Sequence, residues 1–429
     1  MSWALIGMAG VAALGLHLLD ADAAAALGPM TAAVVVLGAG GSVTPSGDVS
    51  AFGLKGAEAT TAIEVMPLGV SLAGALLLAW FFLRSLRGAG LVVSGAELAA
   101  RVGAVVALFL GVIAGLAWAG HDIITIDAGT LMGDKVPGSG ALPDGIADRL
   151  PDGLGDIGGL LPDRISDLIE AEAAVGFTVD TRASLLGGGL WVLGVLLIAL
   201  LASRRTPLPR AWEAVHRVLR PAVSALVAVL LVAVVAGLAA AAYAMIGDDH
   251  PRRVAGAALL GAPNGVWLAV PLGLFVPWDG QATGALVNVL PSPLDELLRA
   301  SSDDPVTLGR LAELDGRVWL LAAAAALMML FAGVLTAVRT PLGGQGAPGF
   351  AGRCAVRLGG VTAVALPLLV WLTRVSADAS LSVFGIDAFD AGIELRGQLM
   401  MALLLGAVWG VGAGQRRSVR AIGVRRRRS

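Results

Sequence analysis

The fold of this chain is decided by residues 254–278, which read VAGAALLGAPNGVWLAVPLGLFVPW. The stretch is long and apolar enough to span a bilayer, since about 20 helical residues cover a hydrocarbon core of about 30 Å. Near its middle, however, Pro263 removes a helix hydrogen bond, Gly265 loosens the backbone and Asn264 brings an amide that needs partners. The alternative is two half-helices that enter and leave on the same side of the membrane. The choice between them sets the topology of every later segment.

The composition is that of an integral membrane protein. Of the 429 residues, 57% are hydrophobic and only 14% are charged, whereas soluble domains carry about 25% charged residues. The single cysteine, Cys354, excludes an internal disulfide and a cysteine-based metal site. The histidines are scattered without the spacing of metal ligands: His17, His121, His216 and His250. The sequence therefore predicts neither a metal nor a cofactor.

Other apolar stretches have the length and hydrophobicity of spanning helices. They are residues 2–19, 66–83, 102–119, 184–202, 221–245, 318–338, 355–373 and 397–413. The first of them lacks the basic lead of a signal peptide, which favours a spanning helix over the alternative of a leader. Residues 23–41 are apolar but broken at Gly28-Pro29. The predicted fold is an all-α, polytopic transmembrane bundle of eight spanning helices with two re-entrant or broken segments.

The distribution of charged residues favours a topology in which both broken segments return to the side of the membrane from which they enter. With that topology and an inner N-terminus, the inner segments hold 18 basic residues and only two acidic ones, Glu97 and Glu213. The outer segments then hold 12 basic and 30 acidic residues, as the positive-inside rule requires. We therefore expect a multi-pass protein of the bacterial plasma membrane with both termini in the cytoplasm.

A topology in which residues 254–278 cross the membrane separates acidic from basic residues poorly. If that stretch crossed the membrane, the acidic segment 279–317 would move inside and the basic tail Arg425 to Arg428 would move outside. For residues 23–41 the same argument is weaker, because few charges separate them from the first helix.

The same order of segments occurs twice, over residues 1–220 and 221–429. Each half reads as a helix, a broken stretch, an outer loop, two helices joined by a basic inner loop, a second outer loop and a last helix. The break at Leu27-Gly28-Pro29-Met30 parallels Gly261-Ala262-Pro263-Asn264. This pattern predicts two parallel repeats about a pseudo-two-fold axis along the membrane normal. A chance alignment of apolar helices is the alternative.

The outer loops, residues 120–183 and 279–317, are the largest segments outside the membrane. The first is acidic and carries three Leu-Pro-Asp units, which predict short amphipathic turns lying on the bundle or on the lipid. Neither loop is long enough for an independent domain. The tail, residues 415–429, is basic.

Several motifs have a plainer explanation than a binding site. Residues 153–158 match the three-glycine dinucleotide pattern, but they lie in an outer loop and no strand precedes them. The clustered aspartates lack the spacing of a calcium loop, which favours a solvated face. The Arg-rich C-terminus is expected to contact anionic lipid head groups rather than nucleic acid. Small residues at helical spacing favour packing within the chain, with a homo-oligomer as the alternative: Gly111, Gly115, Gly406, Gly410 and Gly414.

The candidate site consists of residues that are costly at membrane depth. Asn264 is the strongest candidate to line a cavity, together with Pro263 and Gly265 beside it, Pro29 at the other break and Glu64 at an outer helix end. The alternatives are that Asn264 only satisfies a broken backbone and that Glu64 is an ordinary interface residue. No catalytic triad, cysteine–histidine pair or carboxylate pair can be assembled in the helices, so no catalytic residue and no enzyme are predicted.

Two parts of the chain carry a resemblance to a known family. They are GGSV at residues 40–43, IEVMPLGVSLAGAL at 63–76 and FLRSLR at 82–87, and, in the second half, GAPNGVW at 261–267 and PLGL at 271–274. These residues resemble the streptophobe family of actinobacterial integral membrane proteins, and the resemblance covers most of the chain. It departs at the N-terminus, where members usually have a longer basic lead, so the first helix is expected to be truncated. The resemblance implies a membrane compartment and this architecture, and it implies no activity.

The function that these features favour is a transport-like or channel-like protein for a small solute, because paired broken segments are costly in lipid unless they line a cavity. The alternative is a non-transporting scaffold or accessory subunit of a cell-envelope complex, and a membrane-embedded enzyme ranks third. A transporter needs a polar, water-reachable cavity at Asn264, whereas a scaffold can be dry there.

Overall fold

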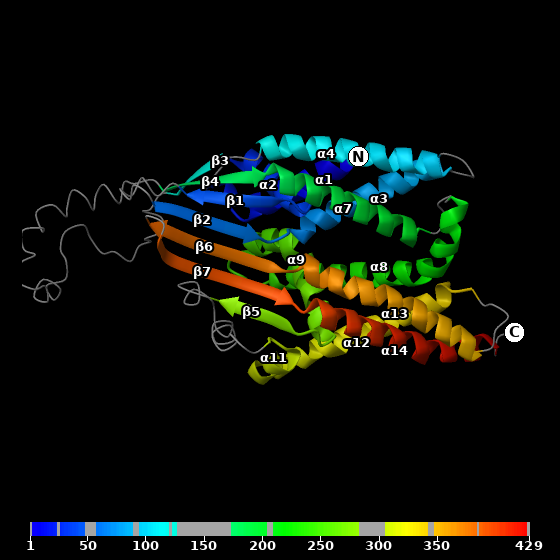
Figure 1. The fold of residues 1–429 in the computed structure, drawn as a ribbon. Coiled ribbons are helices and arrows are strands. Elements are labelled where there is room, and N and C mark those ends of the chain that lie inside the picture. Colours follow the sequence, from blue (N-terminus) through cyan, green and yellow to red (C-terminus); the bar gives the residue numbers. More distant parts are fainter. Residues whose placement is uncertain are drawn as a thin grey trace, which may run out of the picture.

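The computed structural model describes residues 2–23, 26–47, 57–88, 94–119, 122–126, 173–203, 209–282, 305–341, 347–383 and 386–426. These residues form a bundle of helices with a β-sheet at one end (Figure 1). Seven helices are long and apolar enough to cross a membrane: α3 (Leu68–Arg87), α4 (Gly95–Ala119), α7 (Thr181–Ala202), α8 (Arg210–Ala244), α9 (Pro251–Gly273), α12 (Trp319–Arg339) and α13 (Ala347–Leu372). The other α-helices of the described residues are α1 (Ser2–Leu18), α2 (Leu27–Gly38), α11 (Leu308–Leu314) and α14 (Leu399–Arg426).

The count of seven differs from the expected eight. Helix α1 has 17 residues, and in α14, which runs to Arg426, only the fully described part, Leu399–Gln415, enters the count and falls short of 18 residues. A strand runs up to Gly397 immediately before α14, so those residues do not extend the helix. Helix α9, whose course the sequence did not decide, has 23 residues and is one of the seven long apolar helices. The molecule is mostly helical, as predicted.

The sheet has seven antiparallel strands in the order β3-β4-β1-β2-β6-β7-β5. The strands are β1 (Ser42–Gly47), β2 (Ala57–Glu64), β3 (Asp122–Ile126), β4 (Ala173–Asp180), β5 (Trp278–Ala282), β6 (Val375–Val383) and β7 (Ile386–Gly397). The expected all-α class is therefore wrong. Strand β6 reads VSADASLSV, and this alternation of apolar and polar residues is the pattern of a strand with one apolar face.

The outer loops supply these strands. Parts of the loop 120–183 form β3 and β4, whereas the Leu-Pro-Asp units and the amphipathic turns expected after them lie outside the described residues. The loop 279–317 begins in β5 and ends in α11 and a short 3-10 helix, Gly316–Val318. Strand β2 pairs with β6 from Ala57↔Val383 to Glu64↔Ser376, so the sheet continues from the first half of the chain into the second.

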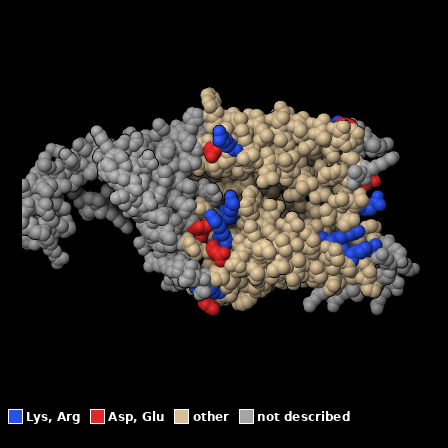
Figure 2. Space-filling view, in the orientation of Figure 1, with Lys and Arg blue, Asp and Glu red and all other residues tan. Residues whose placement is uncertain are grey.

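Two ends of the bundle can be distinguished. The sheet end is where α3, α7, α12 and α14 begin, next to the strands, and the arginine end is where α3 and α12 finish at Arg87 and Arg339. Figure 2 shows acidic and basic side chains at both ends and an uncharged surface between them. That surface carries large exposed apolar side chains, for example Leu190, Val232, Phe331 and Val364, as a lipid-facing surface does.

Aromatic side chains mark both borders of this uncharged surface. Trp118, Tyr243 and Trp319 are exposed toward the sheet end, and Trp80 and Trp212 toward the arginine end. Tryptophan and tyrosine favour the two membrane–water interfaces, because their rings are amphipathic. This distribution agrees with a multi-pass membrane protein.

The interior is divided into two main cores. One core draws its buried residues from Ala4 to Leu200 and the other from Ala222 to Ala413. In each half a hairpin precedes the last helix, and the strand after the broken stretch pairs with that hairpin (β1 with β4, β5 with β7). That the halves are internal repeats remains a prediction.

The small residues of the two glycine motifs behave differently. A Cβ added at Gly406, Gly410 or Gly414 would collide with the backbone or the hydroxyl of residues on α13, so these glycines allow α13 and α14 to approach closely. A Cβ at Gly111 or Gly115 would meet nothing. A packing role within the chain is therefore confirmed for the glycines of α14, whereas Gly111 and Gly115 make no close contact, although α4 itself packs against α7.

Candidate functional site

Helix α9 begins and ends at the sheet end of the bundle (Figure 1). Near its start, Arg253 pairs with Asp20, which follows α1 (Nε to Oδ2, 3.4 Å). After its end, Trp278 pairs with Gly397, next to the first residue of α14. The chain thus returns to the end from which it entered, as the charge pattern favoured. It does so as one continuous helix, so the expected division into two half-helices is wrong.

The proline inside α9 is accommodated by the first half of the chain. Pro263 has no N–H, so the carbonyl of Leu259 loses its usual helical partner. This carbonyl lies against Gly69 of α3, where an added Cβ would collide with it. The glycine thus lets the two backbones meet at the place where the proline has freed a carbonyl.

Asn264 forms hydrogen bonds with the start of α3. Its Oδ1 accepts a hydrogen bond from the N–H of Leu68 (2.9 Å), and its Nδ2 donates one to the carbonyl of Met66 (2.6 Å). Leu68 is the first residue of α3, and Pro67 before it provides no capping side chain. The first N–H groups of a helix have no partner within the helix, so Asn264 caps α3 from the other half of the chain. The alternative that Asn264 satisfies free backbone groups is right, although those groups belong to α3 and not to α9.

The C-terminus of α9 turns the chain back toward the sheet. The N–H of Val276 bonds to the carbonyl of Pro271, and the N–H of Phe275 to that of Leu272, which is the Schellman pattern. Phe275 takes the left-handed conformation there, with φ of 68°, a position that usually holds glycine. The indole Nε1 of Trp409 donates to the carbonyl of Leu274 (3.2 Å) and so satisfies one of the last helical carbonyls.

Helix α2 ends with the same hydrogen-bond pattern. The N–H of Gly41 bonds to the carbonyl of Val36 and that of Gly40 to the carbonyl of Leu37, with Gly40 at φ of 83°. Like α9, α2 leads directly into a strand. The two broken stretches therefore share a helix ending that turns the chain into the sheet.

A cavity of about 300 Å³ opens beside Asn264 at the junction of the two halves. Its walls come from the end of α1, the link between β2 and α3, one face of α9 and the link between α13 and β6: Leu19, Val65, Pro67, Ala257, Leu260, Gly261, Asn264, Gly265, Leu268, Thr373 and Val375. A Cβ at Gly261 or Gly265 would meet nothing within 4 Å. These two glycines, one turn apart on α9, therefore leave the space open.

The walls of this cavity are almost entirely apolar. The amide of Asn264 is bonded to α3, and the hydroxyl of Thr373 donates to the carbonyl of Leu369 on its own helix (2.8 Å). The charged groups nearest in sequence to the lining residue Leu19 are Asp20 and Asp22. A hydrogen bond with His17 holds the pKa of Asp22 below its usual value. The chemistry that this cavity offers is apolar contact rather than solvation of a charge.

The five sequence candidates do not all meet at this cavity. Asn264 and Gly265 line it, and Pro263 is buried in α9 next to them. Pro29 lies in the first turn of α2, where a proline is tolerated, and does not line the cavity. Glu64 is the last residue of β2, one residue before the lining residue Val65, and its side chain lies outside the described part.

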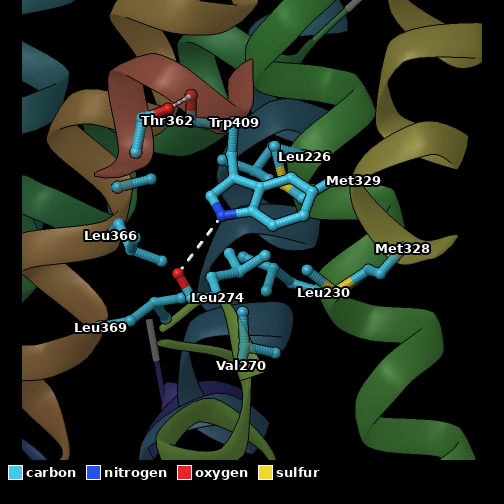
Figure 3. A pocket seen from close by; sticks show the side chains of 12 residues that line it. Leu226, Leu230, Val270, Leu274, Met328, Met329, Thr362, Leu366, Leu369 and Trp409 are labelled. Atoms are coloured by element: carbon cyan, nitrogen blue, oxygen red, sulfur yellow. Dashed lines mark hydrogen bonds between the residues drawn. The ribbon is translucent and has the colours of Figure 1, made fainter. Parts of the chain in front are cut away.

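A second, smaller cavity lies inside the second half of the chain (Figure 3). Its volume of about 10 Å³ holds at most one water. Apolar side chains surround it, among them Leu226, Met329 and Leu366, and the Trp409 indole points across it to Leu274. No group of three or more histidine, cysteine or acidic residues in the described ranges could hold a metal ion.

Sequence reasoning missed most of the lining residues. Leu19, Thr373 and Val375 lie far from Asn264 in the sequence and meet it only through the fold. The alternation of residues 375–383 was the one available signal, because it predicts a strand beginning next to the cavity. No protein-family model, no curated protein and no solved structure matches this chain.

Proposed function

We propose that this chain is a polytopic plasma-membrane protein that takes a small, largely apolar solute, such as an acyl or isoprenoid chain, into the cavity beside Asn264. The observation that carries the proposal is a cavity of about 300 Å³ with apolar walls. A methylene group occupies roughly 30 Å³, similar to the volume of a water in the liquid, so a chain of about ten carbons is of the right size. Buried polar groups that already have partners offer little to a polar solute.

The position of the cavity supports a transport-like role. Its walls belong to the residue after α1 and the link before α3 on one side, and to α9 and the start of β6 on the other. A movement of one half against the other would therefore change its size and its opening. In this proposal the arginine end is cytoplasmic, by the positive-inside rule, and the sheet lies outside. The resemblance to the streptophobe family is part of the proposal and adds no substrate.

The test uses a fatty acid that carries a photoreactive diazirine, added to the protein in lipid nanodiscs. We expect crosslinks to peptides of α9 in the wild type. Gly261→Leu and Gly265→Leu fill the cavity and should lower this labelling about tenfold, since they remove apolar contact area worth more than about 1.4 kcal/mol. Gly103→Leu and Gly111→Leu on α4 are the matched controls, because a Cβ there also meets nothing, and they should label like the wild type.

A second candidate, a scaffold or accessory subunit of a cell-envelope complex, is favoured by the sheet. The seven strands join both halves into one sheet outside the bundle. This sheet forms a larger surface than loops of this length need in order to connect the helices. A Gly265→Cys variant in a Cys354→Ala background separates the candidates. Absence of diazirine labelling with no reaction at position 265 would favour the scaffold. Reaction of position 265 with a charged aqueous thiol reagent, without diazirine labelling, would instead favour a polar solute and contradict the apolar site.

A further inference from the structure

Two arginines near the arginine end of α13 have buried donors without acceptors. Arg353 and Arg357 lie one helical turn apart, so they share a face of α13. The Nε and Nη2 atoms of Arg353 and the Nη1 atom of Arg357 are shielded from solvent and find no hydrogen-bond partner among the described residues. A buried charged donor without an acceptor is strongly unfavourable. A group from outside the described chain is therefore needed to accept these hydrogen bonds.

The chain itself has no carboxylate to spare for them. Residues 316–377 and 395–429, which include α13 and α14, contain no aspartate or glutamate. Glu97 and Glu213, the acidic residues assigned to this side, each pair with an arginine one turn along their own helices, at 2.8 and 4.0 Å. No carboxylate among the described residues at this end is free to accept these hydrogen bonds, and an external anion fits the paired donors.

The surroundings of the pair place this anion at the edge of the lipid-facing surface. Cys354, next to Arg353, is fully buried with Ala337 and Phe350 where α12 meets α13. Val356, next to Arg357, is 73% exposed. One side of the site is therefore closed by the protein, and the other side borders the exposed apolar surface.

We propose that Arg353 and Arg357 bind a phosphate oxyanion, either the head-group phosphate of an anionic lipid or free phosphate. Guanidinium groups present paired donors that match phosphate oxygens. The phosphate groups of a bilayer lie at the depth where a spanning helix leaves the hydrocarbon core. This site is separate from the Arg-rich tail and does not depend on the solute cavity at the other end of the bundle.

The experiment compares the wild type with Arg353→Gln/Arg357→Gln in a neutral, phosphate-free maltoside detergent. Phosphatidylglycerol and inorganic phosphate are added separately, binding is followed by native mass spectrometry, and thermal unfolding is recorded. We expect the wild type to bind phosphatidylglycerol about tenfold more tightly than the double variant, since charged hydrogen bonds are lost. The control Arg84→Gln/Arg87→Gln removes the same charge from exposed residues at the same end and should bind like the wild type.

The two sources of phosphate give different results. If inorganic phosphate raises the unfolding temperature of the wild type and competes with the lipid, the site takes free phosphate, and if only the lipid acts, it is a lipid site. Equal binding by both double variants, or no binding to the wild type, overturns the proposal. If the glutamine pair does not fold, Arg353→Lys/Arg357→Lys keeps the charge. It should still bind more weakly than the wild type, because an ammonium group lacks the paired donors.

Discussion

Asn264 shows how one polar side chain can join two halves of a membrane protein. Its amide provides one acceptor and two donors, and the structure uses the acceptor for the N–H of Leu68 and a donor for the carbonyl of Met66. Both backbone groups stand at the start of α3, are partly buried, and receive no cap from the side chain of Pro67. The main role of Asn264 is therefore to cap α3, and lining the cavity is its second role.

Replacing Asn264 by alanine should destabilise the protein. Leu68 and Met66 would each lose a partner, which costs about 1–3 kcal/mol for a group that stays buried. Asn264→Asp should also destabilise, because a carboxylate oxygen would then face the carbonyl of Met66. The measurement is thermal unfolding in a neutral detergent. Gln398→Ala is the control, since the bond of Gln398 to Asp279 is exposed and its loss should cost less than about 0.5 kcal/mol. An unfolding temperature of Asn264→Ala equal to that of the wild type would show that the cap contributes nothing.

At the scale of the element, α9 combines the length of a spanning helix with the course of a re-entrant one. Its N-terminal part packs against α1 and α3, where Gly15 and Gly69 allow close approach, and its C-terminal part packs against α8 and α12. The Schellman ending at Phe275 then directs the chain back to the sheet. Length and hydropathy do not reveal this course, because the neighbours of a helix determine whether it crosses.

The course of α9 predicts that residues before and after it label from the same side. Cysteines at Asp248 and Asp279, both exposed, are introduced singly in a Cys354→Ala background. We expect both to react with a membrane-impermeant maleimide in intact cells. Ser94, exposed at the start of α4 near the arginine end, serves as the control and should react only after permeabilisation. Opposite labelling of positions 248 and 279 would mean that α9 crosses the membrane.

At the scale of the whole molecule, the sheet and α9 join two cores. Each half has its own buried cluster, and the ladder between β2 and β6 continues the sheet across the boundary. Every backbone group in such a ladder gains a partner. Acidic and basic residues lie together at the sheet end, and arginines outnumber acidic residues at the opposite end of the described bundle.

The ladder predicts a specific crosslink between the halves. Thr60 and Ser380 are directly opposite each other, so Thr60→Cys/Ser380→Cys should form a disulfide, since opposed residues place their Cα atoms about 4.5–5.5 Å apart. Thr60→Cys/Ser382→Cys is the matched control, with a diagonal separation of about 7–8 Å. A protease site inserted between residues 203 and 209 separates the halves, and a non-reducing gel then shows whether they remain linked. Equal crosslinking of both pairs would contradict the register.

The membrane class and the approximate position of most long helices could be predicted from the residues alone, together with an expected separation of charge. These properties depend on local composition: a run of about 20 apolar residues is excluded from water wherever it lies, and lysine and arginine are retained on one side. The charge pattern also favoured the return of residues 254–278 to their side of entry. Pro263 was correctly recognised as exceptional, although it marks a contact rather than a break.

The tertiary structure alone decided the sheet, the role of Asn264 and the shape of the cavity. Strands as short as β3 and β5, with five residues each, gain stability only from partners far away in the chain, so local pattern predicts them poorly. Asn264 finds its partners 196 and 198 residues away. The cavity exists because two glycines of α9 face a space bounded by three other segments. Such features depend on which segments meet, and an isolated segment holds no information about its distant neighbours.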